Sequence, residues 1–299
     1  MKEYVPNYYK KFKCIADRCR HSCCIGWEID IDDETLSNYR KVQGDFGKRL
    51  ENNISLEEIP HFVLSAEERC PFLNTSGLCD VYTTLGEESL CEICKEHPRF
   101  HNFYDSRTET GLGLCCEEAV RLILSQKEPF KIEMLYDGTS HDIDGVFFAK
   151  RNRIFDIVGD KNLSISHRIA KIREEFDIKL PEKSFDEWID IYLSLEILDS
   201  EWEKLLLSVK GKKMQNIKDF YSQECENLLN YFIFRHLRDE DLKNRLAFCI
   251  HCLEMIFDIF SRCGDKRIEK LYDISRMYSA EIEYSEENTD ELMFMMENF

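Results

Sequence analysis

The chain of 299 residues lacks any excess of basic side chains, because 58 acidic residues outnumber 40 lysines and arginines and give a net charge of −18. A nucleic-acid-binding protein needs a basic face that displaces counterions from phosphates, so we expect no nucleic-acid partner. An acidic surface can attract lysine-bearing partners over a distance, or it can merely keep the protein in solution. The composition leaves both interpretations open.

Long apolar runs are missing as well. No stretch approaches the roughly 18 apolar residues that a membrane helix requires, so we expect no membrane partner. The opening segment, MKEYVPNYYKKFKC, does not contain the apolar core of a signal peptide. We therefore expect a cytoplasmic protein, in which thiols stay reduced and the 14 cysteines form no disulfide framework. Clustered cysteines in that compartment usually indicate metal or redox chemistry.

Glycine and proline become rare after about residue 145, where apolar residues recur at helical spacing. This periodicity predicts helices over residues 165–176, 214–238 and 240–263, and from 266 past 278. Ser184 and Glu187 have the spacing of a capping box, which predicts the start of another helix. One face of that helix would carry Trp188, Ile191, Leu195 and Leu198. We predict a mostly α-helical domain over residues 141–299, with its boundary in the polar stretch 137–145.

The cysteines are concentrated in the first part of the chain, since ten of the 14 lie between Cys14 and Cys116. Periodic segments are short there. The predicted elements are a helix over 32–42 with Asp32 or Asp33 as N-cap, a helix over 116–125, and a β-hairpin over 100–104 and 108–114. The predicted fold class is therefore α+β and mainly α. A small cysteine-rich metal or cluster domain with short strands over residues 1–140 would precede the helical domain.

Four thiols fall within eleven residues, at Cys14, Cys19, Cys23 and Cys24. The other thiols of this region form the pairs Cys70 and Cys79, Cys91 and Cys94, and Cys115 and Cys116. Thiolates at such spacing can be folded by turns onto a zinc ion or an iron–sulfur cluster. The last pair opens a predicted helix, whose dipole favours the thiolate form. The pattern therefore favours metal or cluster binding over buried, inert cysteines.

The spacing does not select the metal. Zinc fingers repeat a CxxC pair, which this chain does not do, and Gly26 stands where a CxxxCxxC motif begun by Cys19 and Cys23 would need its third cysteine. Because eight or more thiols exceed the needs of one four-ligand site, two centres and one centre with spare structural thiols both fit. The later cysteines lie on apolar helical patterns, and we expect core packing for Cys225, Cys249, Cys252 and Cys263.

Four blocks of sequence between residues 8 and 126 carry a further signal. The first two are Cys19-Arg-His-Ser-Cys23-Cys24-Ile-Gly26-Trp27-Glu-Ile-Asp-Ile-Asp32, and Cys70-Pro-Phe-Leu73 with Gly77-Leu-Cys79. The other two comprise Gly86-Glu87, Leu90, Cys94, Pro98 and Arg99, and then Leu114, Cys116, Ala119, Arg121 and Leu122. In this order and spacing, the blocks resemble flagellin lysine N-methylases. They resemble more loosely a wider group of zinc- or iron-chelating proteins with CxxCxxCC signatures.

The resemblance implies an iron–sulfur cluster, expected to be 4Fe-4S, with S-adenosylmethionine as methyl donor and bacterial flagellin lysines as acceptors. Carried over by position, it implies a metal site formed by Cys14, Cys19, Cys23, Cys24, Cys70, Cys79, Cys94 and Cys116. Cys91 and Cys115 stand where the family usually has serine, so we expect neither to be an essential ligand. Zinc is the alternative metal. A non-catalytic zinc- or iron-chelating module for protein interaction is the alternative function.

The sequence identifies neither a catalytic residue nor a donor-binding residue. A lysine amine has a solution pKa of about 10.4, so desolvation or a nearby carboxylate or phenolate must remove its proton. The segment 109–113 superficially resembles a Rossmann glycine turn, but polar residues precede it, so we predict a hairpin strand. The donor would then bind at the cluster domain or in a cleft between the domains. Arg99 and Trp27 are candidates for gripping a carboxylate and a cation, beside purely structural roles.

Overall fold

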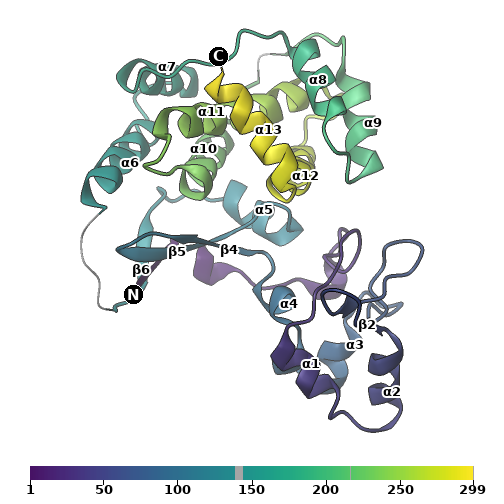
Figure 1. Cartoon of the computed structure of the whole chain (residues 1–299). Helices are drawn as coiled ribbons and strands as arrows, with labels where there is room; N and C mark the ends of the chain where they lie inside the picture. The colour runs from purple at the N-terminus through teal and green to yellow at the C-terminus, as the bar shows by residue number, and fades with distance from the viewer. Residues whose placement is uncertain (139–143, 216, 299) are drawn as a thin grey trace. The chain divides into compact units, whose positions relative to one another are not determined.

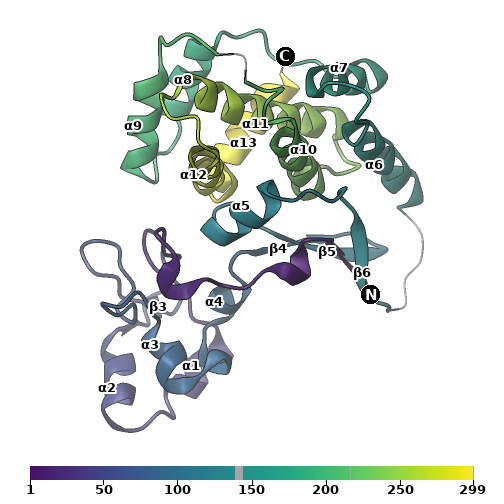
Figure 2. The ribbon, with the colours of Figure 1, turned by 180° about the vertical axis from the view of Figure 1, so that it is seen from behind.

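The computed structural model describes residues 1–138, 144–215 and 217–298. The chain divides into two compact units: a large unit made of residues 1–12 and 100–299, and a thiol unit made of residues 13–99. Each unit has its own apolar core. The ribbon is shown from opposite sides in Figures 1 and 2. This division differs from the expected domains 1–140 and 141–299, because the first twelve residues and residues 100–138 pack with the helices.

A four-stranded sheet of order β4-β5-β1-β6 begins the large unit. Its strands are β1 (Lys2–Pro6), β4 (Arg99–Phe103), β5 (Arg107–Leu112) and β6 (Ile132–Tyr136). Strand β1 pairs in parallel with β5, where Lys2 lies opposite Arg107, and antiparallel with β6. Strands β4 and β5 are joined by a short loop, in which the Tyr104 N–H donates to the Arg107 carbonyl over 2.9 Å. The predicted hairpin is confirmed.

The glycine-containing segment 109–113 runs along β5 and its end, as predicted, and does not form a phosphate-binding turn. Gly111 is required for packing. A Cβ atom added there would lie 2.3 Å from the ring of Phe100 on the neighbouring strand. The absent side chain lets this ring cover the strand.

Helices form the rest of the large unit, and no strand occurs in the described residues after 144. A 3₁₀ turn, η1 (Tyr9–Lys11), follows β1, and helix α5 (Glu117–Leu124) packs against α10 and α12. The later helices are α6 (Gly145–Val158), α7 (Ile165–Glu175), α8 (Phe185–Ser194), α9 (Ser200–Val209), α10 (Ser222–His236), α11 (Leu242–Arg262), α12 (Ile268–Tyr278) and α13 (Glu286–Glu297). Both views show them gathered on one face of the sheet, with α5 beside it (Figures 1 and 2). The mainly α character and the α+β class are confirmed.

Local signals in the sequence account for the helix boundaries. The predicted capping box is present at α8, where the Glu187 N–H donates to Ser184 Oγ and the Ser184 N–H donates to Glu187 Oε2. The helix ends at Ser194, so Leu198 lies beyond it and is 46% exposed. Helix α10 begins at Ser222, later than the residue 214 that periodicity predicted. The predicted α11 and the predicted start of α12 agree with the structure to within two residues.

The core of the large unit centres on α10 and α11. Every residue from Cys225 to Phe234 is buried, and so are Cys249, Cys252 and Cys263. Core packing of the later cysteines is therefore confirmed. His251 lies between two of them and forms a hydrogen bond with the Tyr192 hydroxyl over 3.1 Å, so it is a satisfied core histidine.

An irregular turn follows α12. Residues Ser279–Glu283 form a π-helix, η4, in which the chain winds more widely than in an α-helix. Its last residue, Glu283, carries a fully buried carboxylate. The π-helix thus places an acidic group in the apolar interior.

The thiol unit consists of short elements. They are η2 (Ala16–Arg18), α1 (Asp33–Tyr39), α2 (Gly44–Asn52), β2 (Ile54–Ser55), β3 (His61–Phe62), α3 (Asp80–Leu85), η3 (Glu87–Ser89) and α4 (Glu92–Glu96). Asp32 caps α1 as predicted, because its Oδ1 accepts from the Thr35 N–H over 2.9 Å. Its Oδ2 accepts from the Glu92 N–H, also over 2.9 Å, so one carboxylate caps both α1 and α4.

Two remaining expectations concern boundaries and membranes. Most of the predicted boundary stretch, residues 139–143, lies outside the described residues. None of the helices in the described ranges combines the length and apolar character that a membrane span requires.

Candidate metal centre

Five cysteines help to build the core of the thiol unit. Cys70 and Cys91 are buried in it, and Cys24, Cys79 and Cys94 pack against it. The thiols are close enough to affect one another's ionisation. Burial raises the pKa of Cys70 to about 12, and negative charge on Cys24, Cys79 or Cys91 adds to the rise. The structure thus brings together thiols that span about seventy residues of sequence.

Backbone hydrogen bonds position Cys24, Cys70 and Cys79. The Cys70 N–H donates to the Cys24 carbonyl over 2.9 Å, which joins the first block of the sequence to the second. Cys79 forms an isolated bridge with Leu73 and then caps α3. The turn between Leu73 and Cys79 is closed by Asn74, whose Oδ1 accepts from the Leu78 N–H over 3.0 Å.

Cys91 and Cys94 lie at the start and in the middle of α4. A hydrogen bond from the Cys94 thiol lowers the pKa of Cys91, and the same bond raises the pKa of Cys94. The Tyr39 hydroxyl lies 3.6 Å from the Cys91 sulfur and donates to the Ser89 carbonyl over 2.7 Å. The hydrogen bond between the two thiols therefore favours ionisation of Cys91 over ionisation of Cys94.

Cys23 and Cys24 form the second interacting pair. A hydrogen bond from Cys23 lowers the pKa of Cys24 to about 7, helped by the Ser22 hydroxyl and the positive charge of Arg69 and opposed by burial. The indole of Trp27 donates to the Cys23 carbonyl over 2.6 Å, which fixes the chain just after the pair. Ionised Cys23 and Cys24 also raise the pKa of Cys94, so the two pairs lie near each other.

The donor set fits a thiophilic metal by its chemistry, since the converging side chains are thiols of the kind that bind zinc or iron–sulfur clusters. Among the residues that the structure describes, however, no group of three or more His, Cys, Asp or Glu side chains stands in position to hold a metal ion. A metal would therefore require the thiols to rotate toward a common centre. The arrangement is a cluster of potential ligands rather than a preformed cage.

Three further expected ligands are Cys14 and Cys19, which precede these cysteines in the sequence, and Cys116, which follows them. Cys14 and Cys19 flank η2, where the Ala16 N–H donates to Cys14 Sγ over 3.4 Å and the Cys19 thiol donates to the His21 carbonyl over 3.1 Å. Cys116 caps α5 in the large unit, whereas the other seven expected ligands lie in the thiol unit. Membership of these three cysteines in one site stays a prediction.

The spacing of two residues pairs Cys91 with Cys94, whereas its position in the family pattern put Cys91 outside the essential ligand set. In the structure Cys91 is fully buried in the same core as the other thiols and shares a hydrogen bond with Cys94. Its exclusion from the essential ligands stays a prediction. Cys115, also expected to be non-essential, lies in the large unit, where burial raises the pKa of its thiol to about 12.

Two further candidates have structural partners. Arg99 donates from Nη1 to the Lys95 carbonyl over 2.8 Å, at the end of α4. Trp27 is half-buried, and its ring centroid lies 6.0 Å from that of His97. Burial lowers the pKa of His97 to about 4, so its imidazole is neutral at physiological pH. The roles of Arg99 and Trp27 toward a ligand stay predictions.

The fold and the thiol cluster define a class: a mainly helical protein with a separate cysteine-rich unit. No family model matches the chain, and no solved structure matches it. Among curated proteins, lysine-N-methylase of Salmonella typhimurium is 33% identical over 132 residues, which are 41% of this chain and 32% of that protein. Lysine-N-methylase of Salmonella choleraesuis matches with the same identity and coverage.

A third relative is flagellar biosynthetic protein FliU of Salmonella muenchen. It is 28% identical over 154 residues, which are 48% of this chain and 90% of that protein. The matched segment thus spans about a third of the lysine-N-methylases and most of FliU. The resemblance to flagellin lysine N-methylases is confirmed over less than half of the chain.

Proposed function

We propose that this chain transfers methyl groups from S-adenosylmethionine to lysine ε-amines of flagellin, and that an iron–sulfur cluster in the thiol unit is required. The observation that carries the proposal is the convergence of cysteines in one small core, in a chain related to lysine-N-methylases. We place the reaction in the bacterial cytoplasm, with flagellin as the protein partner and no nucleic acid.

The thiol unit would hold the cluster through Cys24, Cys70, Cys79 and Cys94, with Cys14, Cys19, Cys23 and Cys116 as the rest of the expected set. A bound cluster would supply an iron centre at which the donor can be held. The contribution of the chain is to surround Cys70 and Cys91 with apolar residues such as Ile29, Phe62 and Phe72, which keep water away from these two thiols. Exclusion of water strengthens electrostatic interactions within the site.

Methyl transfer to lysine is an in-line attack by a neutral amine on the sulfonium methyl carbon. The amine must therefore lose a proton first, and its lone pair must be aligned with the carbon–sulfur bond. The acidic chain, with a net charge of −18, favours the approach of a lysine-bearing surface. Positioning and proton removal are the tasks that this protein must perform.

A zinc-braced interaction module is the second candidate. It is favoured by the thiols' role as core residues of the thiol unit. In that case the thiols mainly support the fold, because binding of a structural zinc adds directly to the stability of the segment that forms its site.

Metal analysis combined with a methylation assay distinguishes the two candidates. The protein is purified without oxygen, and iron, acid-labile sulfide and zinc are measured per chain. Methyl transfer from S-adenosylmethionine to the flagellin of the same source is then followed by mass spectrometry. The enzyme proposal expects a brown, iron-loaded protein that methylates lysines, and Cys23→Ser should abolish both the cluster and the activity. A matched control, Cys249→Ser in the large unit, should keep the iron.

A colourless zinc protein without activity would favour the interaction module. A fully loaded iron–sulfur protein that leaves its own flagellin unmethylated would contradict the proposed acceptor.

A further inference from the structure

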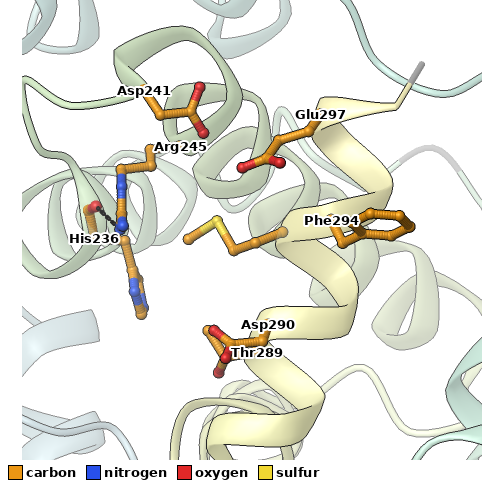
Figure 3. Close-up of a pocket in the computed structure, with 8 residues that line it drawn as sticks. His236, Asp241, Arg245, Thr289, Asp290, Phe294 and Glu297 are labelled. Atoms are coloured by element: carbon orange, nitrogen blue, oxygen red, sulfur yellow. Dashed lines mark hydrogen bonds between the residues drawn. The ribbon is translucent and has the colours of Figure 1, made fainter.

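A pocket of about 300 Å³ opens in the large unit between the end of α10, the start of α11 and α13 (Figure 3). Its volume is at the lower end of the range of small-molecule sites, about 300–1,000 Å³. The close-up shows His236, Asp241 and Arg245 across the pocket from Asp290 and Glu297 of α13 (Figure 3). None of its described lining residues is a cysteine, so the pocket is separate from the thiol cluster.

The charge on its wall is negative. Three carboxylates, those of Asp241, Asp290 and Glu297, face one guanidinium, that of Arg245. Arg245 already donates from Nη1 to the His236 carbonyl over 3.3 Å, and Asp241 accepts from the Asn244 amide over 2.6 Å. Within the described ranges, Asp290 and Glu297 have no ion-pair partner. The wall therefore offers uncompensated negative charge to a cation.

His236 gives the pocket a neutral, oriented hydrogen-bonding group. Its side chain is only 11% exposed, and its Nε2 donates to Glu283 Oε1 over 2.6 Å. That bond leaves Nδ1 as the acceptor nitrogen, and no partner for Nδ1 occurs in the part of the chain that the structure describes. The imidazole can therefore accept a hydrogen bond from a donor in the pocket.

The buried carboxylate of Glu283 is fixed on several sides. Arg235 donates to its Oε1 from Nε over 3.2 Å, and the Tyr231 hydroxyl donates to its Oε2 over 2.9 Å. Because Arg235 balances its charge, Glu283 can remain ionised without exposure to water. The pair of His236 and Glu283 is therefore rigid, as a group that orients a ligand must be.

The shape of the pocket favours an organic cation over a metal ion. Among the described residues, no three acidic or histidine side chains stand close enough to ligate one metal ion. The carboxylates of the pocket are therefore too far apart to coordinate a single ion together. Met293 and Phe294 add apolar surface to the same wall. A ligand that has both a hydrocarbon stem and a positively charged, proton-donating end matches this combination.

We propose that this pocket binds the side chain of a lysine presented by a protein, with its stem on Met293 and Phe294 and its ammonium among the carboxylates and His236. The ammonium would lie in the combined negative field of these carboxylates and donate a hydrogen bond to one of them. The choice of lysine as the cation rests on the proposed function, but the existence of a cation pocket does not.

Binding of a lysine probe to the purified full-length protein tests the proposal. Nα-acetyl-lysine N-methylamide is titrated at millimolar concentration, and amide chemical shifts locate the site. Nα-acetyl-norleucine N-methylamide, which keeps the stem and lacks the ammonium, is the ligand control. The lysine probe should shift resonances of residues 289–297 and 236–245, whereas the norleucine probe should not do so at the same concentration.

Two protein variants complete the test. Asp290→Asn combined with Glu297→Gln should weaken binding of the lysine probe by roughly threefold to tenfold, since each exposed charge contributes modestly. Glu291→Gln is the matched control, because it removes a charge from the same helix at a residue that does not line the pocket. It should bind as the parent does. Equal weakening in both variants would mean attraction by net charge alone and would overturn the proposal, as would shifts located elsewhere.

The proposal and the proposed function can fail separately. Probe binding without any methyl transfer to flagellin would leave the pocket in place and contradict the methyltransferase. Active methyl transfer, with an unchanged KM for the acceptor in the double variant, would contradict the pocket and leave the activity standing.

Discussion

The two compact units use the same residue type in opposite ways. In the large unit, Cys225 and Cys249 are completely buried in helices, and burial raises the pKa of both thiols. In the thiol unit, hydrogen bonds between neighbouring thiols lower the pKa of Cys24 and Cys91 and raise that of Cys94. A buried thiol that accepts a hydrogen bond from a neighbouring thiol ionises more easily than one that is buried among apolar side chains alone.

The units also differ in how they are stabilised. The large unit has an extended core of long helices together with buried ion pairs, whereas the thiol unit has short helices around a small core to which five cysteines contribute. A metal would stabilise the second unit far more than the first, because ligand binding adds directly to the stability of the segment that forms the site.

Removal of the metal should have the largest effect on stability. It should destabilise the thiol unit and leave the large unit folded. Treatment with a chelator, or with an oxidant that destroys the cluster, should expose amides of residues 13–99 to hydrogen exchange. Amides of α10 and α11 should stay protected, because no cysteine on these two helices belongs to the expected ligand set. Hydrogen-exchange mass spectrometry measures both regions in one sample. Uniform protection before and after metal removal would contradict the difference between the units.

Loss of a buried ion pair in the large unit should have the next largest effect on the free energy of unfolding. Arg151 donates from both terminal nitrogens to Glu109, over 2.8 and 2.6 Å, and both side chains are fully buried. Glu109→Gln leaves the guanidinium without a counter-charge, so unfolding by urea should require about 3–5 kcal/mol less. The control is Glu175→Gln, which breaks an exposed pair with Arg153 and should cost less than about 1 kcal/mol.

The large unit should also be sensitive to pH through Glu281. Burial raises the pKa of this carboxyl to about 7, against backbone N–H donors at Leu198 and Asp199. Since its folded pKa exceeds its unfolded pKa, its contribution to stability is complete below about pH 4.5 and is lost as pH rises through 7.

Glu281→Gln removes this titration. The stability of the variant relative to the parent should rise by up to about 3 kcal/mol between pH 4.5 and 8. Urea unfolding at several pH values measures this difference, and Glu286→Gln on the exposed start of α13 should show no such trend. A pH-independent difference between Glu281→Gln and the parent would contradict the shifted pKa.

The smallest effect is expected for the cysteines of the large unit. Cys249→Ala and Cys252→Ala should each cost about 1–2 kcal/mol through lost packing and leave the metal content unchanged. Metal analysis and thermal unfolding of the two variants are the measurements. Loss of iron or zinc from either variant would show that a cysteine of the large unit binds the metal, and it would contradict the difference between the units.

Sequence patterns predicted the elements that depend on local signals. The capping box at Ser184, the N-cap at Asp32 and the apolar period of α11 each act within a few residues, so they could be found without a structure. Strand β1 could not be found, because it is formed by pairing with β5 and β6, more than 100 residues away. That pairing is also why the compact units differ from the expected domains.

The candidate sites show the same limit. Convergence of Cys24, Cys70, Cys79 and Cys94 was expected from their motifs, and they do share one core. The pocket around His236 and Asp290 was missed, because single acidic residues among 58 carry no signal until the helices that hold them are placed. The buried pair of Glu109 and Arg151 was missed for a related reason, since the polar strand gave no sign of burial.

The π-helix at the end of α12 makes the chain intolerant of a length change at that point. An α-helix turns by about 100° per residue, so deletion of one residue within 279–283 would allow an ordinary helix to form and would rotate the next segment of the chain by that angle. Glu283 would then point away from Arg235, Tyr231 and His236, and three partners would lose their common acceptor. Homologous chains that keep this carboxylate should therefore keep the extra residue too, and an alignment gap there would mark a chain that has lost both.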